Sequence, residues 1–595
     1  MEKVGVVDLG GQYTHLIARR VRQLGVYSEV LSARSDAGQL RGFAGLIFSG
    51  GPSSVYDADA PTVSAAILES GLPILGLCYG HQLISYKLGG EVERGEVPEF
   101  GPAEFHPDVS HPLFAGLSPI STVWMSHGDE VKKLPPGFHR IGYTPDCDLA
   151  AVGNDAKKIY GIQFHAEVTH TEEGMAIFKN FLALCGCKFG WKVADYVASL
   201  EAKLRKQCEG RKVFLLVSGG VDSTVAFALL NRALGPERVL GLHIDNGLMR
   251  KNESADVLEF MNKEGFRNLK VRDATADFLK ALDGVYAPEA KRKAIGDTFL
   301  TVKDDALGAL HLDPQEWLLA QGTIYPDTIE SGATKNSAVI KTHHNRVGAI
   351  MELLEKGLVV EPLADLYKDE VRELGLLLGI PPKLIWRHPF PGPGLGVRLL
   401  CNREAGRSVD PGVTAKIRAL LAAEGLEGEV LPVESVGVQG DGRTYAHPCL
   451  LKGPRDWDRA DKISVALTNR VREVNRVVLE IGALAGGAYT SVTAQCDKPR
   501  LDLLREVDDL CTQFLVAENL YATIWQMPVV LVPMEKAGKP VIVLRPVVSS
   551  EAMTARFAVL PFPLLDTLWE KLKAAGVGAL LYDITHKPPG TIEWE

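Results

Sequence analysis

Short apolar runs recur along the first part of the chain, and each is followed by a segment with helical spacing. Four such runs lie at residues 4–7, 46–48, 74–77 and 159–164. Apolar runs of strand length that alternate with helical segments predict a parallel sheet covered by helices. Residues 1–187 are therefore expected to form a doubly wound α/β domain, with candidate site residues at the carboxyl ends of its strands.

The same alternation returns in the middle of the chain, after a helical segment at residues 188–210 that predicts a linker helix. The apolar run Val213–Val217 opens this second part, and a segment rich in proline and glycine closes it at residues 387–396. Residues 211–397 are expected to form a second doubly wound α/β domain.

The last part of the chain, residues 398–595, shows weak self-similarity. Residues 431–436 resemble residues 544–550, and residues 475–481 resemble residues 578–584. Internal similarity of this kind indicates repeated structural units. This part is expected to be an α+β region that arose by internal duplication, with two repeat-like subdomains.

Length, composition and charge narrow the class of protein. A chain of 595 residues is too long for one hydrophobic core and predicts three or four domains. No signal peptide and no apolar run of membrane-spanning length is recognised in the sequence, and the net charge of −9 argues against nucleic-acid binding. The nine cysteines show no CxxC pair, so reduced thiols are favoured over a zinc or dithiol site, including at the close pair Cys185 and Cys187. A cytoplasmic protein without a nucleic-acid or membrane partner is expected.

One cysteine follows a predicted buried strand, in the segment Gly76–Gln82. A helical pattern begins near Gly80, so the Cys78 thiol is expected at a sharp turn beside a helix N-terminus, where free N–H groups favour a thiolate and can hold an oxyanion. His165 follows another strand and can serve as a base, with Glu167 to orient it. A core thiol and a structural histidine are the alternatives.

A glycine pair adds to this pattern, because Gly50 and Gly51 follow the strand at residues 46–48 and can bring a second backbone donor to the same oxyanion. The segment around Cys78, together with His165-Ala166-Glu167, resembles the class I glutamine amidotransferase family. The resemblance implies hydrolysis of glutamine through a thioester on Cys78, with His165 as general base and acid and Glu167 as its orienting carboxylate. The implied oxyanion and glutamine-binding residues are Gly50, Gly51, Tyr79 and Gln82.

A second motif, Ser218–Thr224, lies between an apolar strand and an apolar helix. Backbone N–H groups and hydroxyls at such a turn point into one anion-sized space. The motif lacks the lysine of the GxxxxGKS/T loop, which argues against ordinary γ-phosphate transfer, and a plain glycine turn is the alternative. Asp245 ends the next predicted strand and is placed to meet a nucleoside.

This motif resembles the PP-loop of the ATP pyrophosphatases, a family that binds the β- and γ-phosphates of ATP and expels pyrophosphate. The resemblance implies a Mg²⁺ ion, bound together with ATP, close to Asp222. The implied ATP-binding residues of the loop are Ser218, Gly219, Gly220, Val221, Asp222, Ser223 and Thr224.

Further segments at residues 321–327, 341–345, 387–396 and 587–595 extend the resemblance, over nearly the whole chain, to the GMP synthetase family. The resemblance implies that ATP adenylylates xanthosine 5′-monophosphate (XMP), that ammonia from glutamine displaces AMP, and that GMP leaves. Lys341 would then contact ATP. The implied XMP-binding residues are Arg292, Asp441, Gln526, Lys587 and Glu593.

Several alternatives remain at this stage. Without the resemblance, Arg292 and Lys587 are solvated surface charges, and the neighbours His343 and His344 form a possible metal pair. The activity could be another glutamine-dependent amidation or could be absent, as in a regulatory homologue. The C-terminal region is longer than in short members of the family, so a monomer or a homodimer is expected, with ATP, XMP and glutamine as small-molecule partners.

Overall fold

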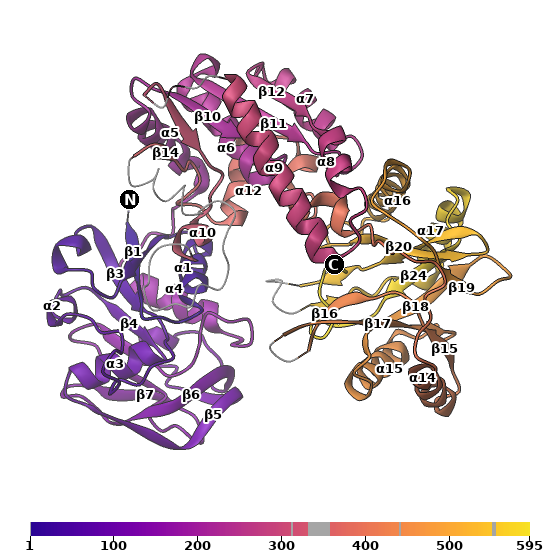
Figure 1. Ribbon diagram of the computed structural model, residues 1–595. Coiled ribbons are helices and arrows are strands. Elements are labelled where there is room, and N and C mark those ends of the chain that lie inside the picture. Colours follow the sequence, from indigo (N-terminus) through magenta and orange to yellow (C-terminus); the bar gives the residue numbers. More distant parts are fainter. Residues whose placement is uncertain (1, 311–312, 314, 331–356, 440–441, 550–554) are drawn as a thin grey trace. The chain divides into compact units, whose positions relative to one another are not determined.

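The apolar runs of the N-terminal part form the parallel strands of one sheet, drawn in indigo and purple in Figure 1. This sheet contains β1 (Lys3–Asp8), β2 (Tyr27–Ser32), β3 (Phe43–Phe48), β4 (Ile74–Leu77) and β9 (Ile159–Ile162), and its helices are α1 (Thr14–Gln23), α2 (Ala65–Leu68), α3 (Tyr79–Lys87) and α4 (Gly174–Leu184). Side chains of α1 and α4 share one hydrophobic cluster with the sheet, and those of α2 and α3 share another. Because two separate clusters flank the strands, both faces are covered, and the predicted α/β class is confirmed.

The computed structural model describes residues 2–595 apart from residues 311–312, 314, 331–356, 440–441 and 550–554. By their internal contacts the residues group into two units. Unit 1 comprises residues 1–203, 322–357 and 361–374, and unit 2 comprises residues 204–321, 358–360 and 375–595. The domain boundaries expected at residues 187, 210 and 397 stay predictions. Within the described part of the chain, no helix is both long and apolar enough to cross a membrane.

An antiparallel extension of the first sheet was not recognised in the sequence. It contains β5 (Glu91–Pro107), β6 (Ser121–Lys133), β7 (His139–Tyr143) and β8 (Ala151–Asn154). Strands β8 and β9 pair antiparallel, and β5 pairs with both β6 and β7. Prolines and glycines interrupt β5, so its sequence lacks the regular alternation that predicts a strand.

A buried arginine joins α1 to a later segment of unit 1. Arg22 donates to the Glu370 carboxylate at 2.8 Å, and both side chains are buried. Its guanidinium also lies 4.6, 5.1 and 5.0 Å from the ring centres of Tyr27, Tyr325 and Tyr367. Glu370 lies in the first turn of α12 (Lys368–Leu377), and Tyr325 begins α10 (Tyr325–Glu330). This cluster therefore ties the start of each helix to α1.

The second sheet, in unit 2, is wholly parallel and has the order β12-β11-β10-β13-β14. Its strand β10 follows the helix predicted before residue 210, and α6 follows β10 at the predicted glycine turn. The elements are α5 (Val193–Gln207), β10 (Lys212–Leu216), α6 (Val221–Leu234), β11 (Val239–Asp245), α7 (Glu253–Lys263), β12 (Leu269–Asp273), α8 (Thr275–Leu282), α9 (Pro288–Leu310), β13 (Trp317–Ala320), β14 (Val359–Val360) and α13 (Pro382–Ile385).

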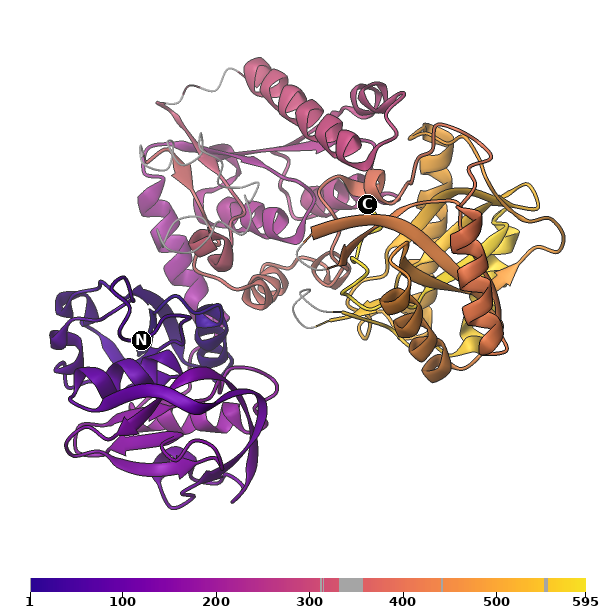
Figure 2. The same ribbon diagram turned by 60° about the horizontal axis from the view of Figure 1, so that its bottom comes forward.

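The third sheet, orange to yellow in Figures 1 and 2, has the order β15-β17-β18-β24-β21-β20-β19, with β16 paired to β17. Its elements are α14 (Pro411–Ala423), β15 (Glu427–Val430), β16 (Ser435–Gln439), β17 (Gly442–Lys452), α15 (Trp457–Arg470), β18 (Val474–Ala483), β19 (Tyr489–Ser491), α16 (Lys498–Ala517), β20 (Val529–Lys536), β21 (Lys539–Leu544), α17 (Phe562–Ala574) and β24 (Ala579–Asp583), with β22 (Val547–Val548) and β23 (Arg556–Phe557) as a separate pair. Successive side chains of β18, β21 and β24 point alternately into two hydrophobic clusters, one on each face of the sheet. The helices α14, α15, α16 and α17 all contribute to one of these clusters and therefore cover that face.

The two halves of this region share a broad element order, because in each a helix precedes a group of strands and a second helix then leads to one strand of the central pair. Strands β15, β16 and β17 lie between α14 and α15, and strands β20 to β23 lie between α16 and α17. Strands β18 and β24 meet in antiparallel pairing between the halves. The similarity proposed between residues 475–481 and 578–584 falls on these two strands. The similarity proposed between residues 431–436 and 544–550 falls on positions that do not correspond, so the duplication is not confirmed.

A buried carboxylate lies across this junction of the halves. Asp583 of β24 accepts hydrogen bonds from Arg476 of β18 at 2.8 Å and from Arg545, next to β21, at 3.2 Å. All three side chains are wholly buried. The nearby charges of Arg545 and Arg476 outweigh the effect of burial and lower the pKa of Asp583. The aspartate therefore stays ionised between its two arginines.

Candidate active sites

Cys78 occupies a strained elbow between β4 and α3. Its backbone angles are φ 50° and ψ −110°, a conformation that non-glycine residues seldom adopt. A Cβ atom on Gly76 would lie 2.6 Å from the Gly80 carbonyl, and one on Gly80 would lie 2.7 Å from the Phe48 oxygen. The elbow therefore needs glycine at both positions. The Cys78 N–H donates to the Ile162 oxygen at 2.8 Å, which ties the elbow to β9.

His165 and Glu167 form a buried pair just beyond β9. The Nδ1 atom of His165 lies 2.7 Å from Oε1 of Glu167, and the Thr171 hydroxyl donates to the His165 carbonyl at 2.6 Å. Burial lowers the pKa of His165, but hydrogen bonds to Cys78 and Glu167 outweigh it and raise the pKa to about 10. The imidazole is therefore held as a cation next to the thiol, as an activated cysteine requires.

The two glycines after β3 lie against this pair. A Cβ atom on Gly50 would lie 3.0 Å from Cε1 of His165 and 3.6 Å from Cβ of Cys78. A Cβ atom on Gly51 would lie 3.3 Å from the ring of Tyr79, whose hydroxyl donates to the Pro61 oxygen at 2.7 Å. Burial raises the pKa of Tyr79 to about 12, so its hydroxyl stays protonated. The structure thus brings both glycines and the start of α3 to the cysteine.

Two buried amides lie on the other side of the sulfur. Gln82 Nε2 donates to the Asp129 oxygen at 2.6 Å and to Gln163 Oε1 at 3.3 Å. Gln163 Nε2 lies 3.7 Å from the Cys78 sulfur. The sequence analysis named Gln82 and missed Gln163. The only local signal for Gln163 is its place two residues before His165, at the end of the same strand.

The predicted glycine turn leads into α6. Gly219 has φ 82° and Gly220 is the N-cap residue, without a side-chain cap. The hydroxyls of Ser218 and Ser223 lie 3.0 Å apart, and Ser218 Oγ accepts from the Gly220 N–H at 3.2 Å. Val221 and Asp222 occupy the first turn of α6. Thr224 is buried, and its hydroxyl has no hydrogen-bond partner among the described residues.

These features make the turn a cradle for an anion, since the N–H groups at the start of α6 are uncapped and hydroxyl groups line the loop. Asp245 ends β11, where its carboxylate accepts from the Gly247 N–H at 2.9 Å. A buried hydroxyl without a partner and a carboxylate in the first helical turn suit a phosphate with its metal ion. Lys341 lies outside the described residues, as do His343 and His344.

Two of the expected XMP residues contact each other in unit 2, and one of them is also held by an arginine that the sequence did not point to. Gln526 Nε2 donates to Glu593 Oε1 at 3.0 Å. Arg398 forms two further bonds with that carboxylate, from Nε at 3.1 Å and from Nη2 at 2.9 Å. Arg398 is almost wholly buried. Burial lowers its pKa, but the charge and hydrogen bonds of Glu593 and the charge of Asp508 together raise the pKa above its ordinary value. The pair therefore fixes Glu593 in one orientation.

The other expected XMP residues are less closely grouped. Arg292 on α9 pairs with Glu289 at 2.7 Å, and the Lys587 backbone pairs with that of Ala555. Asp441 lies outside the described residues. Beside Arg292, the wholly buried Lys291 contacts Glu595 at 2.5 Å and donates to the Leu399 oxygen at 2.7 Å. This contact attaches the C-terminal segment to α9.

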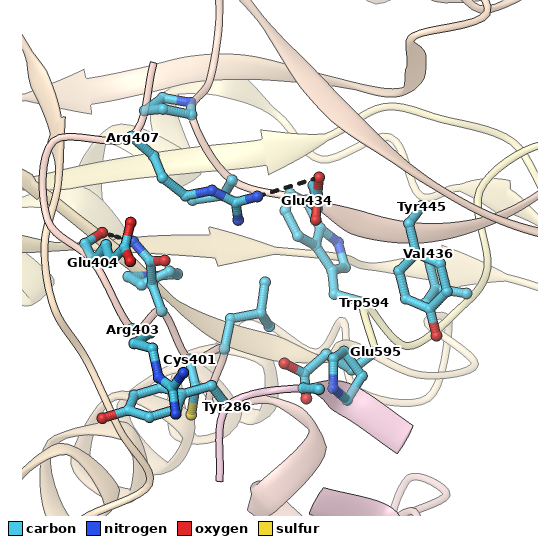
Figure 3. Close-up of a pocket in the computed structure, with 17 residues that line it drawn as sticks. Tyr286, Cys401, Arg403, Glu404, Arg407, Glu434, Val436, Tyr445, Trp594 and Glu595 are labelled. Atoms are coloured by element: carbon cyan, nitrogen blue, oxygen red, sulfur yellow. Dashed lines mark hydrogen bonds and ion pairs between the residues drawn. The ribbon is translucent and has the colours of Figure 1, made fainter. Parts of the chain in front are cut away.

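Unit 2 contains two cavities near these residues. The smaller one, of about 180 Å³, is lined by Gln526, Arg398, Arg250 and Arg387 among others. The larger one, of about 410 Å³, has Trp594 and Glu595 on its wall, and Arg407 reaches Glu434 across it (Figure 3). None of the described XMP candidates lines the larger cavity. Because Gln526 and Arg398 line the smaller cavity, this cavity is the candidate site for the substrate that accepts ammonia.

A wholly buried cluster among the described residues has the composition of a metal site. The ligand atoms of Glu99, His127 and Cys147 lie within 4.8 Å of one another, and all three residues are buried. His127 Nε2 is already 3.0 Å from Glu99, its Nδ1 is 3.1 Å from the Asp129 oxygen, and burial raises the pKa of the Cys147 thiol. Hydrogen bonding accounts for this cluster, so we assign no metal to it.

The chain has a cysteine paired with a histidine at an elbow and also a phosphate cradle. Together they define a class of enzyme in which hydrolysis of an amide supplies ammonia to an ATP-dependent synthetase. Family models match accordingly: glutamine amidotransferase class-I at residues 5–185, NAD synthase at residues 192–295 and GMP synthase C terminal domain at residues 513–594. The chain belongs to the glutamine-hydrolysing GMP synthase family, whose members are ligases.

The relatives that establish this membership cover most or all of the chain. A protein of Leptospira interrogans named "Probable GMP synthase (glutamine-hydrolyzing)" is 47% identical over 605 residues, which is 100% of this chain and 99% of the relative. GMP synthase (glutamine-hydrolyzing) of Enterococcus faecalis is 43% identical and covers 81% of this chain and 96% of its own length. A solved glutamine amidotransferase of Thermotoga maritima is 21% identical, with 34% of this chain and 84% of its own covered and a TM-score of 0.24. The long C-terminal region is thus shared with the Leptospira relative.

Proposed function

We propose that this chain releases ammonia from glutamine at Cys78 and delivers it to XMP that ATP has activated. The overall activity, glutamine-dependent GMP synthesis, rests on the three matched domains and on the relatives named GMP synthase. Its small-molecule substrates are ATP, XMP and glutamine. The observation that supports the residue assignment best is the buried pair of His165 and Glu167 beside the strained Cys78.

In the first reaction the Cys78 sulfur attacks the carboxamide carbon of glutamine. The oxyanion that forms accepts hydrogen bonds from backbone N–H groups at Gly51 and Tyr79, and His165 gives its proton to the departing ammonia. The resulting thioester is hydrolysed by a water that His165 deprotonates, and glutamate leaves. Glu167 keeps the imidazole oriented through both steps.

In the second reaction the turn at residues 218–224 holds the β- and γ-phosphates of ATP. Asp222 would hold Mg²⁺, which neutralises charge on the phosphates when bound. The C2 oxygen of XMP attacks the α-phosphate and pyrophosphate leaves. Ammonia then attacks C2 of the adenylyl-XMP, and AMP leaves in place of a poor oxygen leaving group. We expect Asp245, at the end of β11, to lie beside the nucleoside of ATP, and the role of Lys341 stays a prediction.

For the acceptor, Gln526 and Glu593 provide an amide and a carboxylate that read the edge of the base or the ribose. Arg292 and Lys587 provide cations for the 5′-phosphate. Asp441, the monomeric or homodimeric state, the cytoplasmic location and the absence of a nucleic-acid partner stay predictions.

The test follows the loss of XMP absorbance with ATP and Mg²⁺, with either glutamine or ammonium as nitrogen source. Cys78→Ala should lose the glutamine-dependent reaction and keep the ammonium-dependent one, since only the first needs the thiol. A wild-type chain that uses neither nitrogen source would contradict the proposal. A Cys78→Ala variant that still uses glutamine would place the nucleophile elsewhere.

A further inference from the structure

Three groups surround the sulfur of Cys78. His165 is hydrogen-bonded to it, the Ser126 carbonyl oxygen lies at 3.6 Å, and Gln163 Nε2 lies at 3.7 Å. The carbonyl can only accept, so it favours the protonated thiol. The amide nitrogen can only donate, so it favours the thiolate. The two neighbours thus act in opposite directions on the same atom.

The hydrogen-bond network settles which end of the Gln163 amide faces the sulfur. The Asp129 carbonyl accepts at 2.6 Å from Gln82, so the NH₂ group of Gln82 must point toward it. The same NH₂ group lies 3.3 Å from Gln163, which therefore presents its oxygen there. The NH₂ group of Gln163 is left to face Cys78. His127 supports the chain from its far end, since its Nδ1 lies 3.1 Å from the same Asp129 carbonyl.

Burial makes this contact effective. Gln163 is wholly buried and Gln82 nearly so, and water therefore does not compete for either amide. The backbone of Gln163 is fixed as well, because its N–H donates to the Ala150 oxygen at 2.8 Å. The donor thus points at the sulfur before glutamine binds, without a rearrangement.

We propose that Gln163 is a further catalytic residue of the glutaminase reaction, whose side-chain N–H stabilises the Cys78 thiolate and whose oxygen holds Gln82 in place. This inference rests on the proposed function of Cys78. The two amides then have different roles, because Gln163 stabilises the nucleophile and Gln82 contributes to the binding of glutamine. Loss of the first lowers kcat, and loss of the second raises KM.

The test compares Gln163→Leu and Gln163→Glu with Gln82→Leu in the full chain. Gln163→Leu removes the donor, and Gln163→Glu keeps the size of the side chain while replacing the NH₂ group with oxygen. Both should lower the glutamine-dependent kcat about 10- to 100-fold, the effect of one hydrogen bond to a charged group. Gln82→Leu should mainly raise KM. The ammonium-dependent rate should stay within about twofold in all three, which shows that the synthetase part is intact.

A second readout separates donation to the sulfur from packing. The rate of iodoacetamide alkylation at Cys78, followed by mass spectrometry of its peptide, is measured against pH. The other eight thiols react slowly, because burial raises the pKa of each. Both Gln163 variants should move the midpoint of this profile up by about one pH unit, and Gln82→Leu should move it by less than half as much.

An unchanged midpoint in Gln163→Leu and Gln163→Glu would overturn the proposal, even if kcat fell, because packing alone would then explain the loss. A wild-type kcat in either variant would overturn it as well. Failure of the proposed function looks different, since Cys78→Ala would then still make GMP from glutamine.

Discussion

The pair of His165 and Glu167 gives the sharpest quantitative prediction. Glu167→Gln keeps the shape of the side chain and removes its charge from the 2.7 Å contact with Nδ1. A hydrogen bond to a charged group contributes about 1.5 to 3 kcal/mol, so the glutamine-dependent kcat should fall about 10- to 150-fold. The new NH₂ group would take the place of Oε2, a buried atom without a hydrogen-bond partner in the described part of the chain, so its donors would be buried without an acceptor, which adds a cost in stability.

The assay measures GMP formation at saturating glutamine and at saturating ammonium. Only the first rate should fall, and a loss below about threefold at saturating glutamine would refute the reasoning. The pH dependence gives a second check. The pKa of His165 is raised from 6.5 to about 10 by Cys78 and Glu167 together, so the stability that these two contacts contribute is complete below about pH 6.5 and is lost as the pH rises through 10. The difference in unfolding free energy between the wild type and Glu167→Gln should therefore be largest near pH 6 and shrink toward pH 10.

Three further predictions concern other parts of the molecule. Gly80→Ala puts a methyl group 2.7 Å from a backbone oxygen, so it should cost about 1 to 3 kcal/mol of stability and abolish glutamine use while ammonium use remains, which parallel rate measurements would show. Arg22→Met leaves the buried Glu370 without its cation and should cost about 3 to 5 kcal/mol in urea unfolding, whereas a loss under 1 kcal/mol would mean that the pair is dispensable. Arg398→Lys cannot hold Glu593 through two parallel bonds, so the KM for XMP with ammonium should rise about tenfold or more, and an unchanged KM would separate Glu593 from XMP binding.

Local sequence was enough to predict the elements that carry the two sites. The glycines around Cys78 and the turn at residues 218–224 impose their conformations through residues next to each other in the chain. The buried strands β1, β3, β4, β9 and β10 were equally visible, since each contains or forms a short apolar run. The helical pattern expected to begin near Gly80 is observed as α3, which begins one residue earlier, at Tyr79.

Residues that act through distant partners were not predictable in this way. Gln163 reaches Cys78 across 85 positions, and Arg398 reaches Glu593 across 195 positions. Neither contact can be predicted from the spacing of apolar residues or from turn-forming residues, because each forms only when the sheets have assembled. Lys291 shows the same limit at close range. The sequence pointed to Arg292 as a ligand-binding residue. In the structure the neighbouring Lys291 is the buried cation, and it contacts Glu595.

The junction of β18 and β24 has a consequence for the substitutions that this sheet tolerates. When two identical subunits meet about a twofold axis, every mutation at their interface appears on both sides at once. Here the two strands that meet differ in sequence, so a substitution on one side is not repeated on the other. Asp583 is a single acid that accepts hydrogen bonds from one arginine of each half. A neutral residue at this one position would therefore leave two buried arginines without their carboxylate.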